Sequence, residues 1–167
     1  CGKVTNVVAV PNRNDRPGMV TVTRMGNGKY MAVYEVVNKP SLEVNTAICY
    51  YKISDDGINW NPVDLGKPIL LEDGTGCGSA PFVKWINAGG PNGMVVVVPK
   101  WQVDKNGLIK GGQNFFVNYN YGEGTWERMP MAVTFDGPNT ENLLSGFSCS
   151  IDTNIDGTVL YQAANVE

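Results

Sequence analysis

The chain has 167 residues, of which 43% are hydrophobic and 17% charged, and its formal net charge is −3. This length suits a single domain with a buried core. The 13 basic residues are scattered, whereas nucleic acids and anionic membranes are bound by clustered Lys and Arg, so neither is an expected partner.

The sequence carries no membrane span or targeting signal of its own. Its longest strongly apolar run, Met94 to Val98, is far shorter than the roughly 20 residues that a membrane-spanning helix needs. The chain opens on Cys1-Gly2-Lys3, without the charged and apolar regions of a secretory leader. Because such leaders are removed from mature proteins, we expect a secreted, extracellular protein.

The chain has no histidine and four cysteines: Cys1, Cys49, Cys77 and Cys149. Without histidine, Ser-His-Asp and Cys-His catalysis are excluded, and acid–base chemistry falls to carboxylates. The cysteines form no CxxC pair, so neither a metal nor another cofactor is expected. Cys49 and Cys149 lie in apolar strand patterns and are predicted to be core residues, whereas Cys77, between two glycines, is predicted to be more exposed.

Short β-strands joined by glycine-rich turns dominate the pattern. Met19–Met25 alternates, Gly26-Asn27-Gly28 supplies the turn of a hairpin, and Tyr30–Val37 returns along it. Ala47–Ser54 follows as a third strand. Apolar residues at helical spacing are not found over any comparable stretch, so the fold is predicted to be all-β.

The same unit then recurs. Ala80–Asn87 and Met94–Pro99 form a second hairpin, and Asn114–Asn120 follows as a third strand. Superposing Trp60 on Trp126 aligns the strand, turn and tryptophan of the two units. A self-similar unit of this kind is typical of a β-propeller blade.

We predict a single β-propeller segment over residues 1–167, with blades at approximately 1–78 and 79–145 and an incomplete blade at 146–167. This makes about two and a half to three blades, whereas propellers close with typically 4–8. The remaining blades are therefore expected from the same protein or from a second copy, because an open arc leaves two unpaired sheet edges. A β-sandwich is the alternative fold; it would close its edges but does not account for the repeated turn and tryptophan.

The turn from Ser54 to Trp60 resembles the Asp-box, or BNR repeat, of sialidase-type propellers. In this alignment Asp55 takes the aspartate place, Gly57 the glycine place and Trp60 the aromatic place. A carboxylate in such a turn accepts backbone N–H groups, and glycine takes the left-handed conformation. The motif therefore indicates architecture rather than catalysis.

Further segments, in order along the chain, resemble the exo-arabinanases of glycoside hydrolase family 93, which are six-bladed propellers of the sialidase-like type. They are Arg16-Pro17-Gly18-Met19, Gly26-Asn27-Gly28-Lys29-Tyr30, Tyr34-Glu35, Gly78-Ser79-Ala80-Pro81-Phe82-Val83, Gly89-Gly90-Pro91-Asn92-Gly93, Phe116-Val117-Asn118 and Gly122-Glu123-Gly124-Thr125-Trp126. The resemblance places the chain in the later blades, about half of a six-bladed propeller.

The resemblance implies retaining hydrolysis of α-1,5-linked arabinan by two carboxylates about 5–5.5 Å apart. Glu35 is the candidate for one of them because it ends an otherwise apolar strand. Its structural alternative is an ion pair with Arg16 or Arg24. Where the family pattern places the second carboxylate, this chain has Gly111-Gly112-Gln113-Asn114, which cannot act as acid or nucleophile.

Two nearby acidic residues, Asp104 and Glu123, are predicted to be surface charges rather than substitutes for the missing carboxylate. Substrate binding is predicted for four side chains that suit sugar contacts: Arg16, Trp85, Trp101 and Asn114. An Arg fork donates paired hydrogen bonds, and an indole face stacks on a sugar ring. The alternative for each tryptophan is packing between blades.

The sequence thus predicts a protein that acts on or binds an oligosaccharide or polysaccharide. The first reading is a retaining exo-α-1,5-L-arabinanase with Glu35 as one carboxylate. The second is a non-catalytic propeller module that binds arabinose-containing plant polysaccharide. The third is a structural or partner-binding β-domain with no sugar site.

Overall fold

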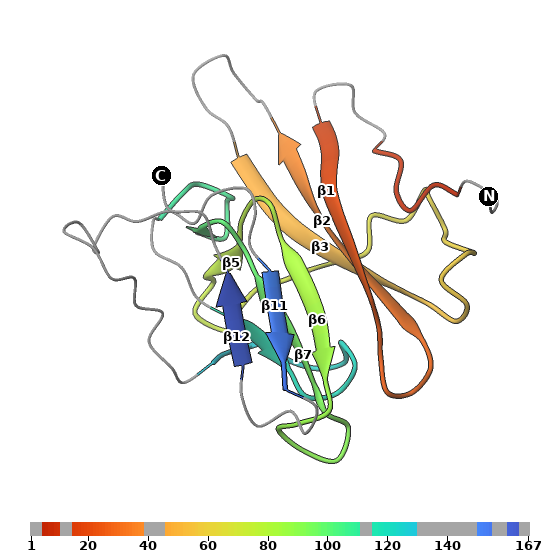
Figure 1. Ribbon diagram of the computed structural model, residues 1–167. Coiled ribbons are helices and arrows are strands. Elements are labelled where there is room, and N and C mark those ends of the chain that lie inside the picture. The colour runs from red at the N-terminus through yellow and green to blue at the C-terminus, as the bar shows by residue number, and fades with distance from the viewer. Residues whose placement is uncertain are drawn as a thin grey trace.

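The computed structural model describes residues 5–10, 15–38, 46–110, 115–129, 150–154 and 160–163. Within these ranges the chain forms strands and turns without a helix (Figure 1), so it offers no helical membrane span there. The strands are β1 (Asp15–Arg24), β2 (Tyr30–Asn38), β3 (Thr46–Ser54), β4 (Lys67–Pro68), β5 (Gly76–Cys77), β6 (Phe82–Ile86), β7 (Met94–Val98), β8 (Gln102–Val103), β9 (Phe116–Asn118), β10 (Glu127–Arg128), β11 (Ser150–Thr153) and β12 (Leu160–Ala163).

The first four strands form an antiparallel sheet in the order β1-β2-β3-β4. The predicted first hairpin is confirmed, and its turn is closed by hydrogen bonds between Met25 and Gly28 and between Met25 and Lys29. Gly28 has a φ of 85°, which glycine adopts without a Cβ clash. The register of β1 and β2 shifts between Gly18 and Thr21, which marks a bulge near the start of β1.

A second four-stranded sheet has the order β10-β9-β7-β6, and β11 pairs with β12. In each of the two larger sheets, the order of the strands across the sheet is their order along the chain, beginning with the first strand of the unit. The small strands β5 and β8 pair with each other and lie on either side of the blade boundary placed after residue 78. The blade boundaries themselves stay a prediction.

The first strands of the three units, β1, β6 and β11, lie side by side and run in the same direction (Figure 1). Two threonines join the edges of β1 and β6: Thr21 Oγ1 accepts the Val83 N–H at 3.2 Å, and Thr23 Oγ1 accepts the Trp85 N–H at 2.9 Å. These bonds satisfy two backbone donors on the free edge of β6. The innermost strands are thereby linked without forming one continuous sheet, as adjacent propeller blades require.

The main core contains apolar side chains from both larger sheets and from the segments that connect their strands. It contains Met25, Met31, Val33, Cys49, Tyr51, Ile69, Leu71, Cys77, Val83, Val95, Val97, Phe116 and Trp126. Tyr51 meets Trp126 edge to face, with ring centroids 5.4 Å apart, and its hydroxyl donates to the Gly122 carbonyl. Trp126 is therefore a core residue packed between the two larger sheets, whereas Trp60 is only half-buried.

The turn after β3 corrects one predicted assignment. Asp56, not Asp55, holds the turn: its carboxylate accepts the backbone N–H groups of Ile58 at 2.9 Å and Asn59 at 2.8 Å. Asp55 is exposed and pairs with Lys29 at 2.8 Å. Gly57, with a φ of 72°, takes the left-handed conformation that was predicted.

The prediction that Cys77 is exposed is wrong. Its side chain is fully buried in the main core, as is that of Cys49. The flanking glycines indicated a turn, but Gly76 and Cys77 form strand β5 and pair with β8, which covers them. Cys149 lies outside the described residues.

Replacing Trp126 by alanine is expected to destabilise the protein by about 3–5 kcal/mol, because a large buried side chain is lost from the contact between sheets. The matched change Trp60→Ala should cost less than half as much, since Trp60 is partly solvated. Urea unfolding of both variants measures the difference. Equal losses would contradict the assignment of Trp126 to the core between sheets.

A second matched pair tests the turn. The backbone N–H of Asn59, then that of Ile58, then the Asn59 side chain, all donating to Asp56, lower the pKa of its carboxyl group. A lowered pKa gives stability that is present above the unfolded value, about 4, and lost as the pH falls toward the folded value. Asp56→Ala should lower the unfolding temperature at pH 7, and this deficit should shrink below about pH 4. Asp55→Ala should have little effect at either pH; if it is the more damaging change, the corrected assignment fails.

Candidate functional site

The candidate site is built around the carboxylate of Glu35 on β2, which is 2% exposed. Arg16 Nη2 donates to Glu35 Oε1 at 3.1 Å, Ser79 Oγ donates to Oε2 at 2.5 Å, and the Ala80 N–H donates to Oε2 at 2.9 Å. Arg16 comes from the neighbouring strand β1, while Ser79 and Ala80 precede β6 in the second unit. The carboxylate therefore lies where the first two units meet.

The sequence around β1 makes room for this contact. Gly18 lies opposite Glu35 in the β1–β2 register. A Cβ on Gly18 would lie 2.9 Å from Arg16 Nη1 and 3.3 Å from Glu35 Oε1, so glycine leaves the space that the ion pair occupies. The next residue, Met19, has a φ of 50°, an uncommon conformation for a residue with a side chain.

The segment before β6 is held in place by the residues that follow β7. The Gly78 N–H donates to the Trp101 carbonyl at 3.0 Å, and the Lys100 N–H donates to the Ser79 carbonyl at 2.8 Å. A Cβ on Gly78 would lie 2.5 Å from Trp101 Cδ1, so the indole packs directly on this glycine. Ala80 has a φ of 50°, which strains the backbone and points its N–H at Glu35.

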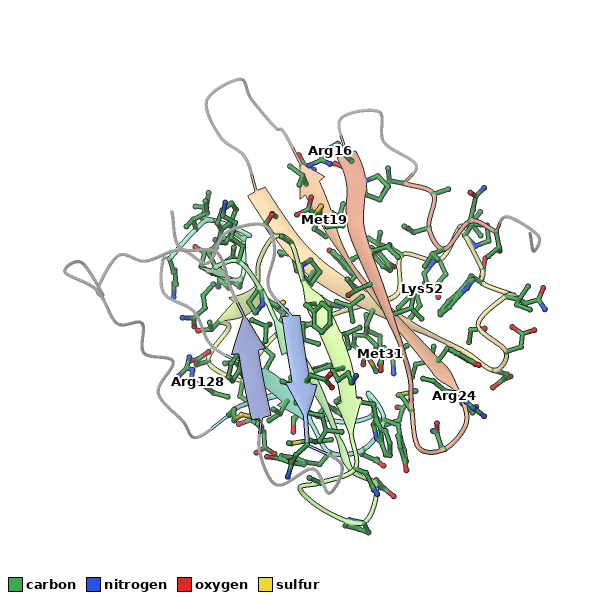
Figure 2. The ribbon with its side chains drawn as sticks, in the orientation of Figure 1. Arg16, Met19, Arg24, Met31, Lys52 and Arg128 are labelled. Atoms are coloured by element: carbon green, nitrogen blue, oxygen red, sulfur yellow. The ribbon has the colours of Figure 1, made fainter. Side chains whose placement is uncertain are left out.

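All three of these hydrogen bonds are donated to Glu35, an arrangement that suits an ionised carboxylate. The Arg16 side chain is 65% exposed, so its guanidinium also faces solvent (Figure 2). Arg24 lies at the other end of β1, over the Tyr30 ring at 6.0 Å (Figure 2). Of the two ion pairs considered from the sequence, the one with Arg16 is present.

A buried thiol lies beside the carboxylate. Cys49 is opposite Glu35 in the β2–β3 register, and its Sγ donates to the Gly78 carbonyl at 2.9 Å. Burial, first of all, raises the pKa of the Cys49 thiol, and the neighbouring Cys77 and Glu35 add to the rise. Cys49 is therefore protonated and acts as a structural hydrogen-bond donor, not as a nucleophile.

The predicted substrate-binding residues fall in different places. Trp101 packs against the segment that carries Ser79, and Lys100 Nζ lies 5.4 Å above its ring. Trp85 is at the opposite end of β6, where its indole N–H donates to the Asn92 carbonyl at 3.1 Å and its ring covers Gly26. Asn114 lies outside the described residues. The structure thus brings Arg16 to Glu35 and Trp101 near them, and it leaves Trp85 apart.

The two substitutes for a second carboxylate lie in exposed turns. Asp104 accepts the N–H groups of Asn106 at 2.7 Å and Leu108 at 3.1 Å. The bond from Leu108 is the main cause of the lowered pKa of the Asp104 carboxyl group. Glu123 pairs with Lys67 at 3.4 Å. In the described part of the chain, no group of three or more acidic or cysteine side chains is arranged to hold a metal ion.

Sequence reasoning did not single out Ser79 and Ala80 as partners of Glu35. They stand 44 and 45 positions further along the chain. Their only signal was membership of the Gly78–Val83 segment, which carries part of the family resemblance. A Ser-Ala-Pro run beside glycine has no pattern that indicates a carboxylate partner, because that contact is created by the packing of two units.

A groove of about 330 Å³ lies along the start of β1, and it shares Gly18 with the site but is not lined by Glu35 or Arg16. It runs between an N-terminal segment and the start of β1, and its lining residues are Thr5, Asn6, Val7, Val8, Pro17, Gly18, Met19 and Val20. The solvent-exposed side of the site is therefore the guanidinium of Arg16.

No family model and no curated protein matches the chain. Solved structures do. The α-L-arabinanase of Penicillium chrysogenum, complexed with arabinobiose, is 32% identical with a TM-score of 0.63, over 78% of this chain and 34% of that one. The GH93 α-L-arabinofuranosidase of Fusarium graminearum, also with arabinobiose, is 25% identical with a TM-score of 0.70, over 98% of this chain and 41% of that one.

The resemblance to glycoside hydrolase family 93 is therefore confirmed at the level of structure. The chain folds as part of a sialidase-like β-propeller, and the alternative of a β-sandwich is not supported. It spans less than half of the length of the solved enzymes that it matches.

Removing the carboxylate should destabilise the fold. In Glu35→Ala the Ala80 N–H and the Ser79 hydroxyl lose their acceptor inside the protein, at about 1–3 kcal/mol for each donor left unsatisfied. Arg16→Ala should cost less than about 1 kcal/mol, because the guanidinium is largely solvated. Denaturant unfolding measures both. A larger loss for Arg16→Ala would show that the exposed ion pair, not the buried pair of donors, holds the site together.

Proposed function

We propose that this chain carries the nucleophile of a retaining glycoside hydrolase that acts on α-1,5-linked arabinan or its oligosaccharides. The observation that supports this most is the environment of Glu35: a buried carboxylate held by three donors, one of which, the Arg16 guanidinium, is largely exposed to solvent. Its setting is a chain similar in structure to enzymes named for arabinose glycosides and bound to arabinobiose.

Glu35 suits the nucleophile's part because a nucleophilic carboxylate must be ionised and fixed in orientation before substrate arrives. In the first step a Glu35 oxygen attacks the anomeric carbon, and the bond to the leaving oxygen breaks as the second carboxyl group protonates that oxygen. The result is a covalent arabinosyl ester of Glu35. Water, deprotonated by the second carboxylate, then displaces the ester and restores Glu35 with net retention.

The second carboxylate is proposed to come from outside this chain, from remaining blades of the same protein or from a second copy. Asp104 and Glu123 are engaged elsewhere, in exposed turns. The similar enzymes are more than twice as long as the part that this chain matches, which leaves room for further blades. Retention requires the two carboxyl groups to lie about 5–5.5 Å apart.

Arg16 is proposed to orient the sugar. Its guanidinium has five N–H donors, only some of which are used on Glu35, and it is largely exposed to solvent. Trp101 and Asn114 remain proposed sugar contacts, as does Trp85, although its position favours packing. Because plant arabinan is extracellular, a secreted protein is proposed, and the turn at residues 54–60 is proposed to be an Asp-box.

A non-catalytic arabinan-binding propeller module is the second candidate. It is favoured by one observation: the Arg16–Glu35 ion pair and its two further donors also form a complete structural unit. Both candidates are expected to bind arabinan, but only the enzyme hydrolyses it. Binding and hydrolysis measured on the same protein samples therefore distinguish the two.

In the protein that includes the remaining blades, Glu35→Gln is expected to lower arabinan hydrolysis by at least about 10³-fold, because an amide cannot form the glycosyl ester. Binding of arabinobiose, measured by calorimetry, should be largely kept. The control is Glu123→Gln, which changes an exposed carboxyl group in an outer turn and should leave the rate unchanged.

Proton NMR of the first product formed tests retention of the anomeric configuration. Binding without hydrolysis at any pH by the unmodified protein, assayed with its remaining blades present, would favour the binding module. Full activity of Glu35→Gln would remove Glu35 from the mechanism, and blank results for both binding and hydrolysis would exclude both candidates.

A further inference from the structure

We propose that Ser79 is a positioning residue that sets the orientation of Glu35 and leaves Oε1 as the attacking oxygen. This inference rests on the proposed function of Glu35 as a nucleophile. It adds a residue from a different unit of the fold, one that acts only through Glu35.

The geometry distinguishes the two carboxylate oxygens. Oε2 accepts the Ser79 hydroxyl at 2.5 Å and the Ala80 N–H at 2.9 Å, which together occupy both of its lone pairs. Oε1 accepts only from Arg16 among these partners, at 3.1 Å. Since the Arg16 guanidinium is largely exposed whereas Ser79 and Ala80 are buried, we assign Oε1 to the solvent side, where it keeps a lone pair for the anomeric carbon.

The Ser79 contact is short and dry. A hydroxyl-to-carboxylate distance of 2.5 Å is at the strong end of the range for charge-assisted hydrogen bonds. Ser79 is buried, so water does not compete for either partner. Together with Arg16 on Oε1, the two donors on Oε2 fix the plane of the carboxylate, and loss of the Ser79 hydroxyl removes the shortest of these three contacts.

The Ser79 backbone is itself fixed from the second sheet. On one side, the Ser79 carbonyl accepts the Lys100 N–H; on the other, Ala80 holds its positive φ of 50°. Gly78 is pressed against Trp101 and bonds to its carbonyl. The orientation of Glu35 is thus set by the neighbouring unit, and movement between the units would move the carboxylate relative to its substrate.

The chain offers a matched control for loss of a hydroxyl at this junction. Thr21 Oγ1 also links the two units: it donates to the Pro81 carbonyl at 3.2 Å and accepts the Val83 N–H. Thr21 is not among the hydrogen-bond donors to Glu35. Thr21→Ala therefore removes a hydroxyl between the same two units without touching the carboxylate.

The experiment compares Ser79→Ala, Ser79→Thr and Thr21→Ala in steady-state hydrolysis of arabinan oligosaccharides. Ser79→Ala should lower kcat by about 10²-fold, the usual effect of a misplaced reacting group. Its KM should change by less than about threefold, because substrate contacts are kept. Ser79→Thr, which keeps the hydroxyl, should recover most of the lost kcat. Thr21→Ala should have the kcat of the unmodified protein.

An activity-independent signal accompanies the kinetics: the Ala80 amide proton in a ¹H–¹⁵N spectrum, which its bond to Glu35 holds at low field. In Ser79→Ala this resonance should move upfield as the carboxylate rotates, while in Thr21→Ala it should stay. If the unmodified protein hydrolyses nothing even with its remaining blades present, the proposed function has failed, and the Ala80 resonance alone still decides whether Ser79 orients Glu35. An unmoved resonance, or an unchanged kcat in Ser79→Ala beside an inactive Glu35→Gln, would overturn the positioning role.

Discussion

The structure depends on a charged carboxylate taken out of water. Burying an ionised group is costly unless hydrogen-bond donors replace its hydration shell. Glu35 receives one donor from the neighbouring strand β1 and two from the segment before β6. The first two units must therefore meet at a defined distance. Gly18 and Gly78 follow from the same requirement, since each leaves space for a side chain that supports this contact.

The innermost strands of the first two units are also held at a defined distance. The hydroxyl groups of Thr21 and Thr23 accept backbone N–H groups of β6, so β1 and β6 are joined by side chains and not by backbone-to-backbone hydrogen bonds. Further from this edge, Trp126 and Tyr51 lock the sheets through apolar packing. A propeller junction of this kind gives a site formed between units rather than on one of them, and its precision comes from both neighbours.

Local features were predictable from the sequence, whereas contacts between units were not. The β1–β2 hairpin followed from alternation and a glycine turn, and Glu35 stood out as a carboxylate in an apolar strand. Ser79 could not be found, because nothing in its neighbourhood indicates a partner 44 residues away. Cys77 was misjudged for the same reason, since β8 covers it. The assignment of Asp55 to the aspartate place of the turn was wrong for another reason. Two adjacent aspartates both fit the sequence pattern of the turn, and only the backbone hydrogen bonds show that Asp56 holds it.

The most direct measurement of the central claim is covalent labelling of the nucleophile. An arabinofuranose-configured cyclitol aziridine alkylates the carboxylate that attacks the anomeric centre, and peptide mass spectrometry locates the label. The account predicts a single label on Glu35, within the strand Tyr30–Asn38, which prior incubation with arabinobiose prevents. A label on another carboxylate, with Glu35 unmodified, would contradict it.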